Sequence, residues 1–254
     1  MQLACRARVP RENFTPEDVS SLQRLDFSEK EGGRTQAFAV EMEKIGAGEV
    51  IEEGIRPIWK GKGAREKLEK ENGRCGGFIG GKKEEQACAE WIQEGLRTEV
   101  LTKLTADQVG CLNNIFFIPK KNGKFRQILD CRPLNSALKD VHFKMDDHRT
   151  VEKLLQKEDW ATSLDLSQAN FLIQVHREFT HFLAFKFRGD FFGFREMLFG
   201  YKDAPRVFPK VMRKAMMQER KRWRVRWITH LDDMLFFIRI EIICGNGGRR
   251  LWNG

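Results

Sequence analysis

The chain has 254 residues, of which 41% are apolar and 32% are charged, and its formal net charge is +9. This length and apolar content suit one large domain or two small ones, and the positive excess favours a polyanionic partner, nucleic acid before membrane. No apolar run approaches the length of a transmembrane helix, residues 1–10 lack the apolar core of a signal peptide, and the six cysteines form no C-x-x-C pair. We therefore expect an intracellular protein of the cytoplasm or nucleus, with no membrane partner, disulfide framework or zinc site.

The first 110 residues are weakly patterned, and we expect a poorly ordered N-terminal region that is separate from residues 111–254. Residues 41–58 could form a helix, although each of their three glycines costs about 1 kcal/mol relative to Ala. Residues 60–85 are rich in Gly, Lys and Glu, which is typical of a solvated linker or a disordered segment. Residues 84–104 have an imperfect apolar face at helical spacing, so they predict a helix.

One short pattern in this region resembles a phosphate loop. Residues 76–82 match G-x-x-x-x-G-K. Lys83, however, stands where such a loop needs Ser or Thr to hold magnesium, and residues 71–74 do not form a buried strand before it. We therefore do not expect an ATP-binding loop here.

A basic hairpin is predicted next. Residues 115–118 form a strand-like run that ends at Pro119, and residues 125–130 read as the returning strand. Between them, Asn122-Gly123 is the strongest two-residue hairpin signal. The tip carries three lysines with an arginine just inside: Lys120, Lys121, Lys124 and Arg126. Such a tip is commonly only solvated, but its charges could also clamp a triphosphate.

A strand that ends in an acid follows. Residues 150–156 have apolar positions at helical spacing and predict a short helix, and residues 160–166 alternate as a strand does. Trp160 and Leu164 fall on its apolar face, while Asp165 falls on the other face near the strand's end. A single aspartate in this position is usually a cap or turn residue.

A second hairpin, at residues 181–197, leads into a strongly basic helix. Asp203 can cap this helix, and Pro205 suits its first turn. Apolar residues at helical spacing from Phe208 to Met216 predict a buried stripe along it. Between Lys202 and Arg226, ten basic residues stand against two acidic ones. With its tryptophans, this segment resembles a surface for a phosphate backbone; a solvated helix face is the alternative.

The most distinctive stretch is residues 230–237, in which apolar residues flank Asp232 and Asp233. The pattern predicts two short buried strands joined by a tight turn, with the aspartates at the tip. Two acids at the end of an apolar hairpin cost desolvation energy unless a cation meets them, and Mg²⁺ prefers carboxylate oxygen. A solvated turn is the alternative, because Asp is favoured in turns.

Taken in order, these blocks resemble the fingers and palm of a reverse transcriptase, and most of all those of LTR and DIRS-like retroelements. The resemblance covers about residues 111–237. Its fingers block is at 117–135, and its palm blocks are at 164–171, 197–205 and 230–233. Four blocks in the same order make chance agreement improbable.

This resemblance implies an α+β fold, with a right-hand polymerase palm (an antiparallel sheet with packed helices) and a partial fingers layer. It also implies an RNA-directed DNA polymerase, a nucleotidyltransferase that joins a dNTP to a primer 3′-hydroxyl by two-metal chemistry. The implied partners are an RNA or DNA template-primer and dNTPs. The implied cofactor is Mg²⁺, as two ions, with Mn²⁺ as a possible substitute.

The resemblance also implies roles for individual residues. The catalytic and metal-binding residues would be Asp165, Asp232 and Asp233. The nucleotide would be contacted by Lys121, Arg126, Ala169, Asn170, Phe199 and Gly200. The basic residues expected along the nucleic acid are Lys120, Lys124, Lys202, Arg206, Lys210, Arg213 and Lys214.

Several positions depart from the family pattern. Asn170 stands where the family usually has Tyr or Phe, the side chain that excludes a ribose 2′-hydroxyl, so the choice of sugar is open. His230 replaces the usual Tyr before the aspartates. Residues 238–254 resemble no thumb, and no RNase H region follows, so we expect a truncated retroelement product. The alternatives are a catalytically dead, nucleic-acid-binding remnant and an RNA-directed RNA polymerase with a similar palm.

Overall fold

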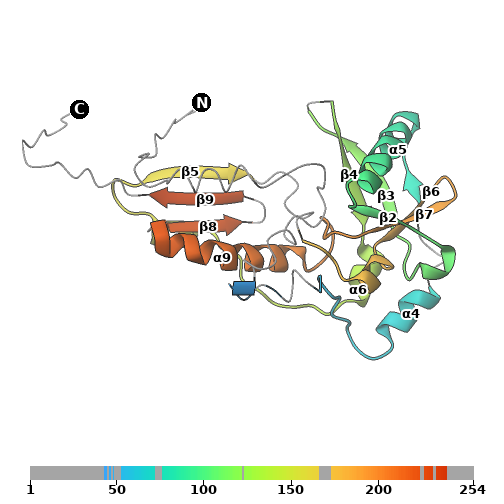
Figure 1. Cartoon of the computed structure of the whole chain (residues 1–254), viewed down its shortest axis with the longest axis horizontal. Helices are drawn as coiled ribbons and strands as arrows, with labels where there is room; N and C mark the ends of the chain where they lie inside the picture. Colours follow the sequence, from blue (N-terminus) through green and yellow to red (C-terminus); the bar gives the residue numbers. More distant parts are fainter. Residues whose placement is uncertain are drawn as a thin grey trace, which may run out of the picture. The chain divides into compact units, whose positions relative to one another are not determined.

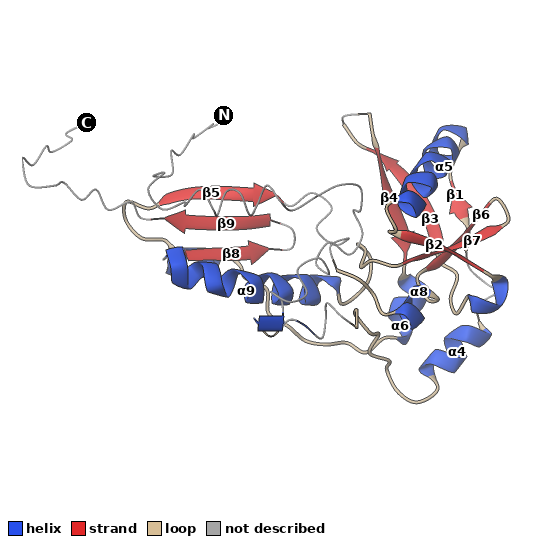
Figure 2. Cartoon of the chain, viewed as in Figure 1, coloured by secondary structure: helices blue, strands red, loops and turns tan. Residues whose placement is uncertain are grey.

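The computed structural model of the chain describes residues 43, 44, 46, 48, 53–71, 76–121, 123–165, 173–223, 226–230 and 233–238. Its helices here are α4 (Ala64–Lys70), α5 (Lys82–Arg97), the 3₁₀ helix η3 (Ala106–Gln108), α6 (Arg132–Ala137), α7 (His148–Leu154), α8 (Arg177–Thr180) and α9 (Ala204–Trp223). The strands are β1 (Phe78–Ile79), β2 (Leu101–Leu104), β3 (Asn114–Pro119), β4 (Phe125–Asp130), β5 (Trp160–Asp165), β6 (Ala184–Phe187), β7 (Asp190–Phe194), β8 (Arg226–His230) and β9 (Asp233–Ile238) (Figure 2). None of the helices described is both long and apolar enough to span a membrane.

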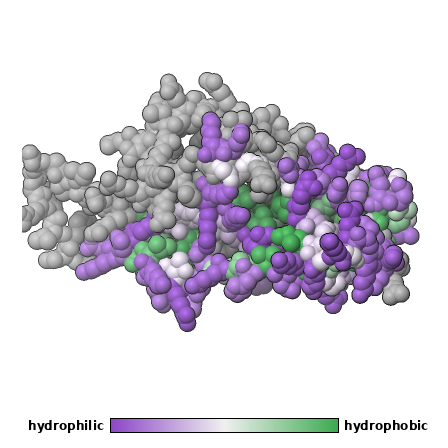
Figure 3. Space-filling model, turned by 90° about the horizontal axis from the view of Figure 1, so that it is seen from below, coloured by the Kyte–Doolittle hydropathy of each residue, from purple (hydrophilic) through white to green (hydrophobic). Residues whose placement is uncertain are grey.

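The strands in the described ranges form three three-stranded sheets, ordered β1-β3-β4, β2-β7-β6 and β5-β9-β8. All of their strand pairs are antiparallel except β1 with β3. The expected α+β architecture of antiparallel sheets with packed helices is therefore confirmed. The molecular face in Figure 3 is mostly hydrophilic with smaller apolar patches, as expected for a chain with 32% charged residues.

The main core joins α5 to the first two sheets. Trp91 of α5 has its ring centroid 5.9 Å from that of Phe117 in β3 and 5.5 Å from that of Phe194 in β7. Ring pairs of this kind contribute about 0.5–1.5 kcal/mol beyond the area that they bury. The helix itself begins after Gly81, whose backbone N–H donates to the Glu84 carboxylate at 3.1 Å. This bond satisfies a donor that the first turn would otherwise leave without a partner.

The third sheet packs next to α9. Figure 1 shows β5, β9 and β8 side by side, with α9 along β8. Phe208 and Val211 of α9 are buried, as the predicted apolar stripe requires, and the helix continues through Pro209. On the apolar face of β5, Trp160 is 54% and Leu164 46% exposed. In the described sheet β5 is an edge strand that pairs with β9 only.

The stretch at residues 60–85 is not a linker where the structure describes it. It contains α4, whose Leu68 is buried, and β1, which pairs with β3 in the register Phe78↔Ile115. The ring of Phe78 lies 5.6 Å from that of Phe187, edge to face. The prediction failed because averaged composition hides a few apolar residues that tertiary contacts bury. Residues 72–75 lie outside the described part.

The predicted domain boundary at residue 110 is also wrong. Strand β2 pairs with β7 in the register Leu101↔Phe194, so the sheet joins both sides of that boundary. The backbone N–H groups of Gly110 and Cys111 both donate to the His181 carbonyl, at 2.9 and 3.2 Å. The helix predicted at residues 84–104 ends at Arg97, because the residues after it pair with a strand far along the chain.

The remaining N-terminal predictions fare differently. In the range 41–58, residues 43, 44 and 48 are helical, but residues 53–59 are not, and they form the bridges Ile55↔Val175 and Trp59↔Leu138. The expected absence of a phosphate loop agrees with β1, which lies inside the G-x-x-x-x-G-K pattern instead of before it. Residues 1–42, expected to be poorly ordered, lie outside the described residues.

Candidate active site

Two of the predicted acidic residues occupy facing positions in the β5-β9-β8 sheet. Asp165 is the last residue of β5 and Asp233 is the first residue of β9, and the two are direct partners in the antiparallel register. Such partners share one face of a sheet, with Cβ atoms about 4.5–5.5 Å apart. Asp233 is exposed. The side chain of Asp165 and the whole of Asp232 lie outside the described part.

The β8–β9 hairpin has the predicted tight turn. His230 and Asp233 are partners in the register, so two residues connect the strands. Two-residue connections are the commonest hairpin loops, and they favour residues such as Asp that tolerate turn conformations. Behind the turn, Met234 and Phe237 are buried, at 2% and 1% exposure. The apolar residues that flank the aspartates thus anchor the hairpin, and its acidic end lies beside the end of β5.

An ion pair fixes the opposite end of this sheet. The guanidinium of Arg226, in β8, donates to the carboxylate of Asp159, just before β5, and to the carbonyl of Leu154 in α7. The side chain of Asp159 is fully buried and that of Arg226 is 17% exposed. Removing one partner from a buried pair is costly, because a buried charge is left behind. Arg226, which the sequence grouped with a basic surface, therefore has a structural contact.

The basic hairpin is confirmed as β3 and β4, with partners from Asn114↔Asp130 to Pro119↔Phe125. Lys120 N–H donates to the Lys124 carbonyl at 2.6 Å, and Gly123, at φ +77°, turns the chain back. Asn122 lies outside the described residues. The side chains of Lys120, Lys121, Lys124 and Arg126 are exposed. Four cations at one hairpin end suit a polyphosphate partner.

The turn before α9 carries two of the predicted nucleotide-pocket residues. Phe199 is 54% exposed. Gly200 has φ +100°, and a Cβ there would lie 2.9 Å from the Leu129 carbonyl oxygen, so the site requires glycine. Ala169 and Asn170, the other predicted pocket residues, lie outside the described part of the chain.

Asn135, at the end of the fingers block, holds this turn. Its Nδ2 donates to the Gly200 carbonyl at 2.7 Å, and its Oδ1 accepts from the Lys202 N–H at 3.0 Å. One side chain thus satisfies backbone groups on both sides of Tyr201. The sequence block contained Asn135, but no local signal indicated what it would bond.

Four of the basic residues on and before α9 have partners within the described part of the chain. Arg206 donates two bonds to the Asp203 carboxylate, at 3.2 and 3.0 Å, and this contact raises the pKa of Arg206. Lys202 pairs with Asp140, and Arg213 pairs with Asp146 at 2.9 Å. Lys214 donates to the carbonyl of Gly46, and Lys210 is exposed. Contact between these residues and nucleic acid stays a prediction.

Replacing Asn135 tests its hold on the turn. In Asn135→Ala both bonds are lost, so we expect amide exchange at residues 199–202 to become faster and stability to fall by about 1–2 kcal/mol. Hydrogen exchange and chemical denaturation measure the two effects. The control is Ser136→Ala, whose hydroxyl bonds only to Pro133 within α6 at 2.7 Å. Equal rates of amide exchange at residues 199–202 in the two variants would show that Asn135 does not hold the turn.

Comparison with known proteins identifies the family. The model of the family described as "Reverse transcriptase (RNA-dependent DNA polymerase)" matches residues 118–243. Residues 118–243 belong to the reverse transcriptase family. The matched range contains Asp165, Asp232 and Asp233, as well as Lys121 and Arg126 of the basic hairpin.

Retrotransposon polyproteins are among the relatives of this reverse transcriptase. The Transposon Tf2-3 and Tf2-4 polyproteins of Schizosaccharomyces pombe (strain 972 / ATCC 24843) are each 30% identical to it over 159 residues. This match covers 61% of the chain but 11% of each polyprotein. The chain therefore corresponds to a small part of the length of these relatives.

Solved structures show the same fold. Native prototype foamy virus protease-reverse transcriptase aligns with a TM-score of 0.54 at 17% identity, over 62% of this chain and 20% of that one. The foamy viral protein in complex with double-stranded DNA aligns with a TM-score of 0.55 at 19% identity, over 63% of this chain and 27% of that one. At these identities the likeness establishes the fold alone.

Proposed function

We propose that this chain adds deoxynucleotides to a primer 3′-hydroxyl on a nucleic-acid template, as an RNA-directed DNA polymerase. The observation that carries the proposal is the register Asp165↔Asp233, which joins two acidic positions, far apart in the sequence, at one end of a sheet. If these aspartates were unrelated turn residues, nothing would require them to be direct partners in one sheet. Asp232 directly precedes Asp233 in the sequence and completes the proposed set.

The donor set fits a divalent cation. Carboxylate oxygens are the ligands that Mg²⁺ prefers, and the family generally uses divalent metal ions. The described side chains, which do not include those of Asp165 and Asp232, contain no cluster of three or more His, Cys, Asp or Glu that could hold a metal ion. Bound by these three aspartates, a pair of ions would activate the attacking hydroxyl and stabilise the leaving pyrophosphate. The chain's own role is to hold Asp165 and Asp233 at one end of the β5-β9-β8 sheet.

The basic hairpin supports a role in binding the triphosphate and the template-primer. Lys121 and Arg126 offer a point charge and a planar fork, both of which suit phosphate oxygens. The solved complex of the foamy viral relative contains double-stranded DNA, which supports a nucleic-acid partner for this chain as well. Phe199 and Gly200, in the turn held by Asn135, would contact the nucleotide.

A primer-extension assay tests the function directly. The chain is incubated with a labelled DNA primer on an RNA or a DNA template, with dNTPs or rNTPs, and with Mg²⁺ or Mn²⁺. We expect extension with dNTPs that depends on the added metal. Retained template binding without extension in any condition would favour the non-catalytic remnant, and a preference for rNTPs would favour an RNA-directed RNA polymerase.

Lys121→Ala tests the triphosphate contact. Hydrogen bonds to charged groups are worth about 1.5–3 kcal/mol, so we expect the KM for dNTP to rise at least about tenfold with little change in stability. The control is Lys83→Ala, which removes the same charge from another exposed lysine, in α5. If both variants have the same KM, Lys121 does not contact the nucleotide.

A further inference from the structure

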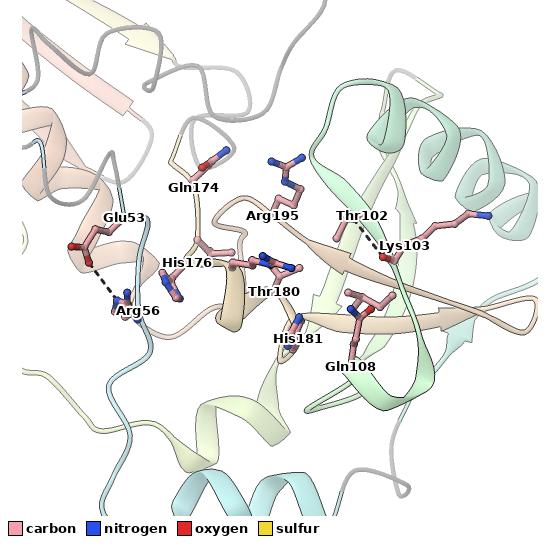
Figure 4. Close-up of a pocket in the computed structure, with 13 residues that line it drawn as sticks. Glu53, Arg56, Thr102, Lys103, Gln108, Gln174, His176, Thr180, His181 and Arg195 are labelled. Carbon is pink, nitrogen blue, oxygen red and sulfur yellow. Dashed lines mark hydrogen bonds and ion pairs between the residues drawn. The ribbon is translucent and has the colours of Figure 1, made fainter.

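A cavity of about 530 Å³ opens in the described part of the chain, and none of its lining residues belongs to the basic hairpin or to the β5-β9-β8 sheet. Figure 4 shows the side chains around it, which come from the segment before α4, from β2 and η3, from the residues around α8, and from the residue after β7. The volume is within the usual range for small-molecule sites. Its charged residues are Glu53, Arg56, Lys103, Arg177 and Arg195.

The lining is rich in positive charge and hydrogen-bond donors. The lining itself has four cationic side chains and one carboxylate, that of Glu53, which lies 3.5 Å from Arg56. Arg195 also pairs, at 3.6 Å, with Glu99, which is not a lining residue. Two histidines, two glutamines and two threonines add further donors. The Nδ1 of His176 accepts from the Glu178 N–H at 3.3 Å, so the neutral ring carries its hydrogen on Nε2. Burial, and then the charge of Arg177, lowers the pKa of His181, consistent with a positive potential.

The cavity wall is rigidly built. Val175 N–H donates to the Arg195 carbonyl and Arg195 N–H to the Val100 carbonyl, each at 2.9 Å. The Ile55 N–H donates to the Gln174 carbonyl, and the Ile55 carbonyl accepts from the His176 N–H, each at 2.9 Å. A Cβ on Gly54, at φ +74°, would lie 2.6 Å from the backbone of Val175. Only glycine allows these segments to approach so closely.

We infer that this cavity is a binding site for a phosphate group, carried either by a free phosphorylated ligand or by a nucleic-acid backbone. The formal excess of three positive charges suits a multiply charged anion better than a carboxylate. Arginine forks match phosphate oxygens, and the donors approach from separate segments, as a tetrahedral anion requires. Because the wall is already formed, binding of the ligand costs little conformational entropy.

Histidine NMR tests this site in the full chain. The Cε1–H signals of the five histidines are followed while inorganic phosphate, a twelve-nucleotide oligothymidylate or sodium acetate is added at constant ionic strength. We expect saturable shifts of His176 and His181 with phosphate or with the oligonucleotide, and none at His142 or His148. Saturation by phosphate alone identifies a free ligand, and tighter binding of the oligonucleotide identifies a strand.

A pair of double variants separates specific binding from general charge. Lys103→Gln with Arg177→Gln removes two exposed cations from the lining, and we expect the affinity for the phosphate probe to fall at least about tenfold. Lys82→Gln with Arg97→Gln removes the same charge from α5 and should change the affinity less than about twofold. Shifts with neither probe, equal shifts with acetate, or unchanged binding by the first double variant would overturn the assignment.

Discussion

Asp165→Asn is expected to lower the rate of primer extension at least about a thousandfold. The substitution keeps the size of the side chain but removes the negative charge that would hold a divalent ion opposite Asp233. Metal ions supply several kcal/mol of charge stabilisation in such reactions, and each 1.4 kcal/mol changes the rate about tenfold. The measurement is the single-turnover rate of primer extension with dNTPs and Mg²⁺. Asp232→Asn should have an effect of the same size.

Asp190→Asn is the matched control for this loss. Asp190 is also an exposed strand-end aspartate, paired with Phe187 across the β6–β7 hairpin. Asp190 is not one of the proposed metal ligands, and surface substitutions are nearly neutral. The Asp190→Asn variant should therefore extend primers at a rate within about twofold of the parent. Thermal unfolding of all three variants checks the fold. An Asp165→Asn protein that extends primers within tenfold of the parent would exclude Asp165 from catalysis.

Asn113→Ala is expected to destabilise the chain by about 3 kcal/mol, because this buried side chain bridges two parts of the main core. Asn113 is 0% exposed, and its Nδ2 donates to the Phe182 carbonyl at 2.9 Å and to the Ala184 carbonyl at 3.1 Å. Its backbone N–H also donates to Ala184, at 2.8 Å. A buried acceptor left without its donor costs about 1–3 kcal/mol. The shift of the urea midpoint, at unchanged slope, measures the effect.

The neighbouring asparagine provides a control of the same chemistry. Asn114 is only half-buried, and its Oδ1 accepts one bond, from the Gly77 N–H at 3.3 Å. Asn114→Ala should therefore cost about 1 kcal/mol. If Asn113→Ala costs no more than Asn114→Ala, the bridge between β3 and β6 contributes little to stability. Because both residues lie outside the acidic set, extension by the folded fraction should be retained in each.

Local sequence patterns were sufficient to predict the strands and the helix that carry the candidate site. Strand-like runs on either side of Asn122-Gly123 predicted β3 and β4, and apolar runs on either side of Asp232 and Asp233 predicted β8 and β9. The helix after Asp203 followed from its apolar stripe. These predictions held because turn residues and side-chain periodicity act over a few neighbouring positions.

Only the tertiary structure decided how those elements meet. It paired Asp165 with Asp233, joined β2 to β7 across the predicted domain boundary, and placed Asn135 against the turn at Gly200. It also brought separate segments together around the cationic cavity. Each of these contacts joins residues far apart in the chain. Their free energy comes from burial and hydrogen bonding between whole elements, which no local pattern of residues encodes.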